Sequence, residues 1–447
     1  MNEAVSRERT RNYLRQIKGA VVYRALAMAA SFLAIPMMIH YLGQEQFGVW
    51  STILTVMAWT VFFDLGVGNG LRNKVAESIA KGATNEAAGY ISSAYTLIGF
   101  IALAIWMTVT VASYFVPWQI VFNTEAISES TLRETIQIAS FFIVLNFWIG
   151  LISALLNAVQ RTSMVALGQL VTNLLLLALV YFLASPTDAS ITKLALIYGI
   201  SIVSANILLS YLFYKDHREL RPRLSFNSAH LNPLLTLGLQ FFTIQFAVLI
   251  IFTTDKMLIT QLFGPQYVTQ YEVVFKLFSI ITFAHGLISA PLWSTYTDAY
   301  HRGDLPWIKS TLHGQLIIFL VTSGVVAATA LAAKPLIEMW LGSDIDVPNN
   351  LIVAMSLLVI ISTWNNVFGV ILGGLGKIRL GSIYTIATAI VNLPISYYFS
   401  QILDFGIAGV VLGSIVSILI SSVLSPIQVY YFIYTTDKSE RLNNLLR

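Results

Sequence analysis

Apolar stretches of about 20 residues recur along the whole sequence, and a helix of that length crosses the roughly 30 Å hydrocarbon core of a bilayer. Only 11% of the residues are charged, whereas an ordinary soluble domain carries about 25%. The chain of 447 residues is therefore predicted to be an all-α integral membrane protein with about twelve transmembrane helices. The apolar segments lie at residues 18–41, 47–70, 88–113, 135–158, 163–184, 192–214, 232–262, 267–292, 308–332, 350–374, 379–401 and 406–434.

Lys and Arg are distributed unevenly among the segments that connect these spans. Positive charge in short loops marks the cytoplasmic side of a membrane. With the N-terminus inside, 20 of the 26 Lys and Arg fall in cytoplasmic segments and three in outer loops. Both termini are therefore expected in the cytoplasm. The longest outer segment, 114–134, is too short for a catalytic domain, and the absence of Cys excludes thiol chemistry, so no enzyme is expected.

The two halves of the chain match each other weakly. A shift by nearly half the chain length places "IHYLGQEQF" (39–47) over "ITQLFGPQY" (259–267), and nearly the same shift brings "AKG" (80–82) to "HRG" (301–303). A slightly smaller shift places residues 155–170 over 371–386. Parallel repeats of this kind are typical of transporters. The expected parts are a basic tail (1–17), an N-lobe of helices 1–6 (18–214), a cytoplasmic linker (215–231), a C-lobe of helices 7–12 (232–434) and a C-terminal tail (435–447).

Two pairs of segments carry a resemblance to a known family. "YLGQEQFGVW" with "FDLGVGNGLRNKVAESIAKG", and "TTDKMLITQLFG" with "YEVVFKLFSI", resemble the polysaccharide-export and O-antigen flippase branch of the multidrug/oligosaccharidyl-lipid/polysaccharide exporter superfamily. The resemblance covers residues 10–435. It implies two six-helix lobes in a V-shaped fold in the bacterial cytoplasmic (inner) membrane. It also implies that undecaprenyl-pyrophosphate-linked oligosaccharide moves from the inner to the outer leaflet by alternating access.

Arg24 lies about two turns inside the first span, where an ionisable residue costs several kcal/mol unless it is paired or meets water. Its guanidinium suits phosphate oxygens, so Arg24 is a candidate anchor for an anionic substrate. Snorkelling of the side chain to the cytoplasmic interface is the alternative. The resemblance, which implies cationic groups in the cavity, favours the anchor.

Asp255 and Lys256 are adjacent within the seventh span, and Glu272 and Lys276 lie one turn apart in the eighth. Successive helix residues point about 100° apart, so Asp255 is expected to bond a neighbouring helix while Lys256 meets water. All four side chains are at similar depth and are predicted to form a network. Lys256 and Lys276 would bind pyrophosphate or sugar hydroxyls, and Asp255 or Glu272 would take up a proton or Na⁺. A purely structural link between the two helices is an equal alternative.

Asp64 falls near the inner end of the second span, close in sequence to Arg72 and Lys74. It is a candidate for gating or ion coupling at the cytoplasmic mouth. A solvated, structural carboxylate at the interface is favoured over that role. The sequence predicts no metal site at any of these positions.

The favoured function is export of a lipid-linked oligosaccharide for O-antigen, lipopolysaccharide or another surface polysaccharide. No bound cofactor is expected. Transport is expected to be coupled to an H⁺ or Na⁺ gradient. The partners are the lipid-linked oligosaccharide, membrane lipids and glycan polymerase or ligase machinery, without nucleic acid, and a monomer suffices. An ion-coupled multidrug antiporter of the same superfamily is the alternative, and Arg24 in place of an acid argues against it. A further alternative is a scaffold that assembles glycan enzymes, and the function of such a protein would tolerate neutralisation of Arg24.

Overall fold

Helices joined by turns and short irregular segments make up the described ranges. A computed structural model describes residues 3–59, 66–183, 188–289, 291–342, 345–377 and 379–445. Nine helices within these ranges are long and apolar enough to cross a membrane. The first, Lys18–Ala58, covers one expected span and part of the next. The prediction of an all-α membrane protein is confirmed, and the count of twelve spans stays a prediction.

The chain divides into two compact units, and the break falls inside one helix. Unit 1 comprises Met1–Phe246 with Gly264–Gln266, and unit 2 comprises Ala247–Phe263 with Tyr267–Arg447. Helices of unit 1 are α1 (Glu3–Ala58), α2 (Val67–Ala80), α3 (Thr84–Ala112), α4 (Trp118–Phe122), α5 (Glu129–Ile149), α6 (Ile152–Ala158), α7 (Thr162–Leu183), α8 (Ile191–Asp216) and the 3₁₀ turn η3 (Arg218–Leu220). Helix α9 (Ser228–Phe263) begins in unit 1 and ends in unit 2. Helices of unit 2 are α10 (Pro265–Ser289), α11 (Leu292–His301), α12 (Leu305–Leu331), α13 (Ala333–Leu341), α14 (Asn349–Gly374), α15 (Arg379–Tyr397), the π-helical turn η4 (Tyr398–Ile402) and α16 (Ile407–Leu445).

Side-chain caps fix where several helices begin. Ser128, Ser190 and Asp304 precede α5, α8 and α12, and each side chain accepts a hydrogen bond from a backbone amide of the first turn. Such a bond satisfies one of the amides that a helix start leaves without a partner. These polar residues therefore mark the boundaries between apolar segments.

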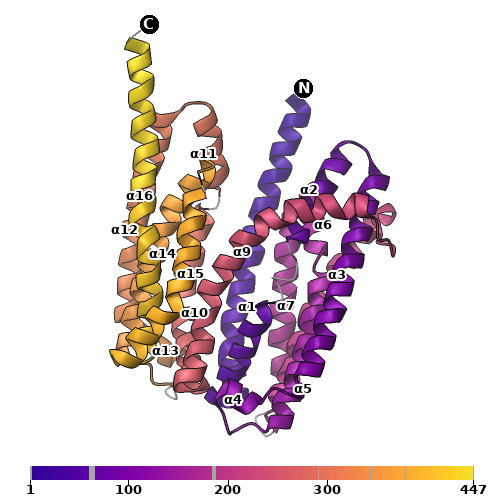
Figure 1. Cartoon of the computed structure of the whole chain (residues 1–447), viewed down its shortest axis with the longest axis vertical. Helices are drawn as coiled ribbons and strands as arrows, with labels where there is room; N and C mark the ends of the chain where they lie inside the picture. Colours follow the sequence, from indigo (N-terminus) through magenta and orange to yellow (C-terminus); the bar gives the residue numbers. More distant parts are fainter. Residues whose placement is uncertain are drawn as a thin grey trace. The chain divides into compact units, whose positions relative to one another are not determined.

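Unit 1 is held together by α1 on α7, α5 on α8 and α2 on α3 (Figure 1). Its core contains Leu71 from α2, Ile91 from α3, Ile152 from α6 and Phe213 from α8, all fully buried. The first turns of α9 pack on this core through Leu234. The short helix α2 is thereby fixed against α3 and α6, which positions its polar side chains.

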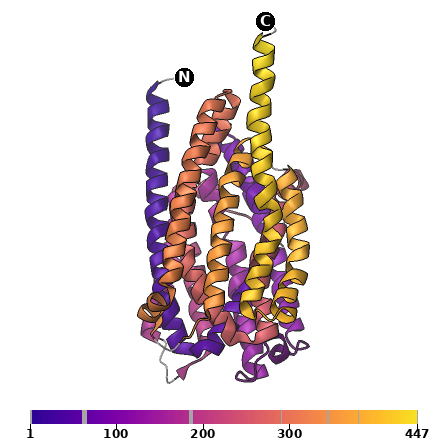
Figure 2. The ribbon, with the colours of Figure 1, turned by 90° about the vertical axis from the view of Figure 1, so that its left-hand side faces the viewer.

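In unit 2, α16 packs against both α14 and α15, and Figure 2 shows these orange and yellow helices side by side. Small residues form the contact of α16 with α15 and with η4. A Cβ atom on Gly413 would lie 2.2 Å from Ser396 Oγ, and one on Gly409 would lie 2.5 Å from the Ser400 backbone. Small residues allow helix backbones to approach closely in a membrane, where lipid provides no hydrophobic drive for association.

The internal repeat is visible in matching turns. Gly82 and Gly303, which end the aligned segments "AKG" and "HRG", have φ angles of 72° and 73°. In both turns the glycine amide donates to the carbonyl three residues earlier, at 3.0 and 3.1 Å. The next amide donates to the carbonyl five residues earlier, at 2.9 Å in both. This pattern is a helix C-terminal turn that favours glycine.

A second pair of turns repeats where the smaller of the two shifts aligns the halves. Gln160 and Gly376 occupy the same place in this alignment and have φ angles of 58° and 68°. Their amides donate to carbonyls three residues earlier at 3.1 Å, and the amides of Arg161 and Lys377 donate to carbonyls five residues earlier at 2.8 Å. The two halves therefore share local backbone geometry at the positions that the sequence comparison aligns.

Candidate functional site

Helices α9 and α10 bring two of the predicted site residues into contact. Lys256 Nζ lies 2.5 Å from Glu272 Oε2, and the two side chains are 19% and 17% exposed. Lys276, one turn beyond Glu272 on α10, is half-buried and interacts electrostatically with both. The three residues will be called the α9–α10 charge cluster. Its two lysines and one glutamate carry a net positive charge.

Asp255 points elsewhere, as expected for a residue adjacent to Lys256 on a helix. The residue is buried, with 4% exposure. Ser414 Oγ of α16 donates to its carboxylate at 3.1 and 3.2 Å, and the Tyr271 hydroxyl of α10 donates at 3.3 Å. Among the described residues its partners are thus neutral hydroxyl groups. The predicted four-residue network therefore forms in part, and the predicted bond from Asp255 to a neighbouring helix is present.

The hydrogen bonds continue from Asp255 to α15. Asn392 Nδ2 donates to Ser414 Oγ at 3.0 Å, and Thr254 Oγ1 donates to Asn392 Oδ1 at 3.3 Å. Asp255, Thr254, Asn392 and Ser414 are all less than 9% exposed, and they will be called the Asp255 network. Its carboxylate, hydroxyl and amide oxygens are ligands of the type preferred by hard cations, and the carboxylate can also accept a proton. Among the described residues, no group of three or more His, Cys, Asp or Glu could hold a metal ion.

Two other predicted site residues are not part of this arrangement. Arg24 lies on α1 in unit 1, is exposed, and has no ion pair with a described residue. Asp64 lies outside the described residues. The sequence reasoning missed Asn392 and Ser414, which carry no charge.

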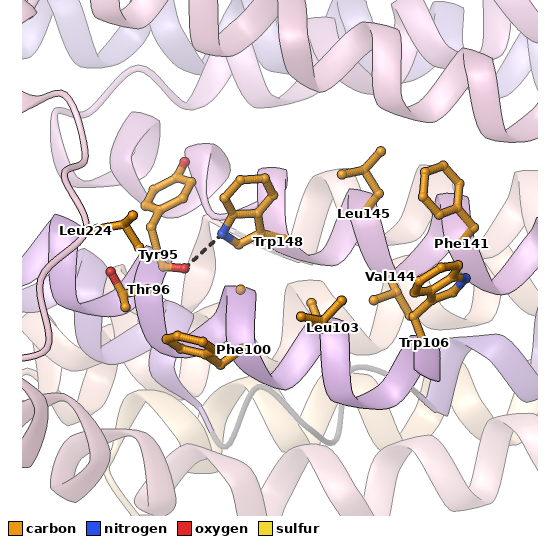
Figure 3. Close-up of a pocket in the computed structure, with 12 residues that line it drawn as sticks. Tyr95, Thr96, Phe100, Leu103, Trp106, Phe141, Val144, Leu145, Trp148 and Leu224 are labelled. Atoms are coloured by element: carbon orange, nitrogen blue, oxygen red, sulfur yellow. Dashed lines mark hydrogen bonds between the residues drawn. The ribbon is translucent and has the colours of Figure 1, made fainter. Parts of the chain in front are cut away.

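An apolar pocket of about 330 Å³ lies between α3 and α5 in unit 1. Figure 3 shows Phe100, Leu103 and Trp106 of α3 facing side chains of α5. The Trp148 indole donates to the Tyr95 carbonyl at 2.8 Å and ties the two helices together at one end. The lining suits a hydrocarbon chain and offers no charged group to a polar head.

Outside the spans, Glu77 on α2 lies between two lysines. Lys81 Nζ and Lys74 Nζ lie 2.6 and 2.9 Å from its carboxylate oxygens. These hydrogen bonds, the one from Lys81 first, lower the pKa of Glu77 to about 2. The same bonds raise the pKa of both lysines. The group stays ionised at all physiological pH values and cannot act as a proton carrier there.

Two proteins described as O-antigen transport or export proteins are similar to this chain over most of its length. A protein described as a candidate O-antigen transporter of Salmonella typhimurium is 25% identical over 406 residues, covering 86% of this chain and 88% of its own length. A protein described as a candidate O-antigen export protein of Yersinia pseudotuberculosis is 20% identical over 418 residues, covering 89% and 91%. Both descriptions name transport or export, in agreement with the expectation that the chain is not an enzyme.

Solved transporter structures share the fold. An inward-facing multidrug resistance MATE family transporter of the MOP superfamily superposes with a TM-score of 0.78 at 14% identity, covering 94% of this chain and 99% of that one. A MOP superfamily transporter from Pyrococcus furiosus gives 0.65 at 15% identity, covering 94% and 95%. The family model described as polysaccharide biosynthesis protein matches residues 18–291, which is more than half of the chain. The chain therefore belongs to the polysaccharide biosynthesis protein family and has the fold of MOP superfamily transporters.

Proposed function

We propose that the protein exports a lipid-linked oligosaccharide of the O-antigen type, carried on undecaprenyl pyrophosphate, from the inner to the outer leaflet of a bacterial inner membrane. Membership of the polysaccharide biosynthesis family and the two relatives described as O-antigen transport or export proteins support this substrate class. The MOP transporter fold supports alternating access as the mechanism. The termini face the cytoplasm, and one chain, which carries both repeats, suffices.

The α9–α10 charge cluster is the observation that carries the proposal. Lys256 and Lys276 together exceed the charge of Glu272, at the depth of an apolar helix pair. Because each ionisable residue in an apolar helix is costly, the presence of three such residues together indicates a charged ligand or a water-filled path. A diphosphate is the ligand that complements the excess positive charge. Arg24, exposed on α1, supplies a further cation for the same class of ligand.

The Asp255 network supplies the coupling step in this proposal. Asp255 takes up a proton or Na⁺, since its partners are neutral hydroxyls. The membrane potential acts in the same direction: each negative charge that leaves an inside-negative cell gains about 2.3 kcal/mol per 100 mV. The exported glycan is then passed to polymerase or ligase machinery at the outer leaflet.

The test is appearance of a fluorescent undecaprenyl-pyrophosphate oligosaccharide at the outer leaflet of proteoliposomes under an imposed potential. Wild type is compared with Arg24→Ala and with Lys256→Ala/Lys276→Ala. Lys193→Ala is the matched control, because this lysine pairs with Asp188 at 3.3 Å outside both clusters. We expect translocation by wild type and the control, and at least about a tenfold loss in the cluster variant, since a charge-assisted contact is removed.

An ion-coupled multidrug antiporter is the second candidate, because the MATE structures that share the fold are multidrug transporters. The same proteoliposomes distinguish the two. If folded wild type moves no lipid-linked glycan but exchanges a cationic drug for H⁺ or Na⁺, the export proposal is wrong and the antiporter replaces it. If folded cluster variants translocate the glycan as fast as wild type, the role given to Lys256 and Lys276 is wrong.

A further inference from the structure

A polar cavity of about 420 Å³ opens among α2, α5, α6 and α8 in unit 1. Its lining includes Arg72 of α2, Asn146 of α5, Asn157 of α6 and Asn206 of α8. Asn206 Nδ2 donates to Asn146 Oδ1 at 2.6 Å, which leaves the remaining amide donors and acceptors of both side chains for other partners. Arg72 is exposed, and the three asparagines are half-buried. The lining contains no acidic residue.

A break in a membrane helix forms one wall of the cavity. Helix α5 ends at Ile149, and α6 begins at Ile152. Across the break, the amides of Leu151 and Ser153 donate to carbonyls three residues earlier instead of four. The carbonyls of Phe147 and Ile149 thereby lose the regular helical donor. At membrane depth such a break is tolerated where it is buried in protein or lines a watery cavity, and discontinuous helices often line transporter binding sites.

The second repeat carries an aromatic contact at the corresponding place. The alignment that pairs Gly82 with Gly303 places Arg72 over Trp293. The alignment that pairs Gln160 with Gly376 places Asn157 over Gly373. The Trp293 ring packs on Gly373 so closely that a Cβ there would lie 2.2 Å from it. Helix α14 also runs unbroken from Asn349 to Gly374. Within the described residues, the helix break and the Arg72 and Asn157 side chains are therefore features of unit 1 that the second repeat does not share.

We propose that this cavity binds the phosphate-bearing sugar of the lipid-linked glycan. This inference rests on the proposed function and adds a substrate subsite to it. Arg72 binds a phosphate oxygen through its guanidinium fork, and Asn146, Asn157 and Asn206 bind sugar hydroxyls through their amides. The volume lies in the range of small-ligand sites, about 300 to 1,000 Å³, so the cavity takes the sugar nearest the phosphate and not a whole polymer.

The charge and lining of the cavity argue for this ligand over others. One arginine without an acidic neighbour in the lining disfavours a cationic drug. The amide groups can donate and accept at once, as a ring of sugar hydroxyls requires. A phospholipid headgroup also carries a phosphate but has fewer hydroxyl groups than a sugar. The asparagine amides should therefore favour binding of the glycan over binding of the phospholipid.

The test is equilibrium binding to purified protein in nanodiscs, with three probes. They are the undecaprenyl-pyrophosphate oligosaccharide, undecaprenyl phosphate without sugar, and phosphatidylglycerol. The variants are Arg72→Gln, Asn157→Leu and the double change Arg72→Trp with Asn157→Gly, which copies the aromatic contact of the second repeat. Arg218→Gln, an exposed arginine of η3 outside the cavity, is the control. Thermal unfolding checks that every variant is folded.

We expect Arg72→Gln to weaken binding of the oligosaccharide probe about tenfold, because a charge-assisted contact is lost. Asn157→Leu should weaken binding of the oligosaccharide probe but leave binding of undecaprenyl phosphate unchanged. Arg72→Trp/Asn157→Gly should abolish the difference in affinity between these two probes. The inference is overturned if the double variant is folded and binds and translocates the oligosaccharide like wild type. It is also overturned if Arg72→Gln weakens phosphatidylglycerol as much as the glycan, since the site would then hold a lipid headgroup.

The two proposals fail in distinguishable ways. If wild type translocates the glycan and the cavity variants do so equally well, export stands and the cavity site falls. If wild type neither binds nor moves any lipid-linked glycan, the proposed function falls and the subsite falls with it. Should the double variant fail to unfold cooperatively, Arg72→Gln decides alone, because it changes an exposed side chain.

Discussion

Ser414 on α16 donates its hydroxyl hydrogen to Asp255 on α9, 159 residues earlier in the chain, at 3.1 Å. The hydrogen-bond donors to this carboxylate are hydroxyl groups, from Ser414 and from Tyr271. Within the part of the chain that the structure describes, no cation binds this carboxylate. The proposed function has this carboxylate take up a proton or Na⁺, and that role can be tested by removing the charge while keeping the shape.

Asp255→Asn should leave the fold intact and abolish ion dependence of transport. The amide oxygen still accepts from Ser414, while the cost of placing a charge in a buried site disappears, so the unfolding temperature should stay the same or rise. Transport measured with and without an H⁺ or Na⁺ gradient checks the first part, and thermal unfolding in detergent checks the second. Ser414→Ala is the control that removes the partner but keeps the carboxylate. Persisting gradient dependence in Asp255→Asn would rule out this residue as the coupling group.

Breaking the pair between Lys256 and Glu272 should destabilise unit 2. Lys256→Met or Glu272→Gln alone should cost about 2 kcal/mol, less than for a fully buried pair because both side chains are partly exposed. The double variant should cost less than the sum of the two, and a double-mutant cycle on unfolding free energies measures the difference. Additive effects would show that the two charges do not stabilise each other.

Gly413→Ala should destabilise the contact between α15 and α16. The new Cβ would lie 2.2 Å from Ser396 Oγ, so the helices must separate, at a cost of about 1 to 3 kcal/mol. Gly369→Ala on α14 is the matched control, since a Cβ there meets nothing within 4 Å and alanine favours the helix. Thermal unfolding of the two variants should move in opposite directions, and a common direction would contradict this packing.

The bonds of Glu77 to Lys74 and Lys81 should stabilise the folded protein only above acidic pH. Because the folded pKa is lowered from its usual 4.5 to about 2, the contribution is complete above 4.5 and is lost as the pH falls towards 2. The difference in unfolding temperature between wild type and Glu77→Gln should therefore be present at pH 7 and vanish near pH 2. It should be small, because the side chains are exposed. A difference that grows on acidification would contradict the assignment.

The sequence predicts the charged contacts better than the neutral ones. The helical angle between successive residues separates Asp255 from Lys256, and similar depth groups Glu272 and Lys276 with them in one predicted network. The pairing of Lys256 with Glu272 within that group comes from the structure. Asn392 and Ser414 could not be found in this way, because neutral polar residues are common in membrane helices and their contacts join segments far apart in the chain. The signal that could have found them is their position within the small-residue contact of α15 and α16.

Turn glycines could be predicted from the sequence better than the helix break. The segments that end at Gly82 and Gly303 match in sequence, so the repeat could be identified before the structure, and the two φ angles then agree. The break between Ile149 and Ile152 contains no proline, and its one glycine, Gly150, is a weak signal because glycine is frequent in membrane helices. The role of Arg24 stays a prediction, because exposure on α1 fits both a phosphate anchor and a snorkelling side chain.

The close fit of Gly409 and Gly413 against Ser400 and Ser396 also limits which motions unit 2 can make. A shift of α16 along α15 by one helical turn would bring one of these glycines into the place of the other and a larger side chain into the second place, which admits only a hydrogen atom. The two helices must therefore travel as one rigid body. If Asp255 takes up an ion as proposed, the accompanying rearrangement has to be absorbed by α9 and α10. The carboxylate of α9 reaches that body through the Ser414 hydroxyl, a hydrogen bond that can be released and remade.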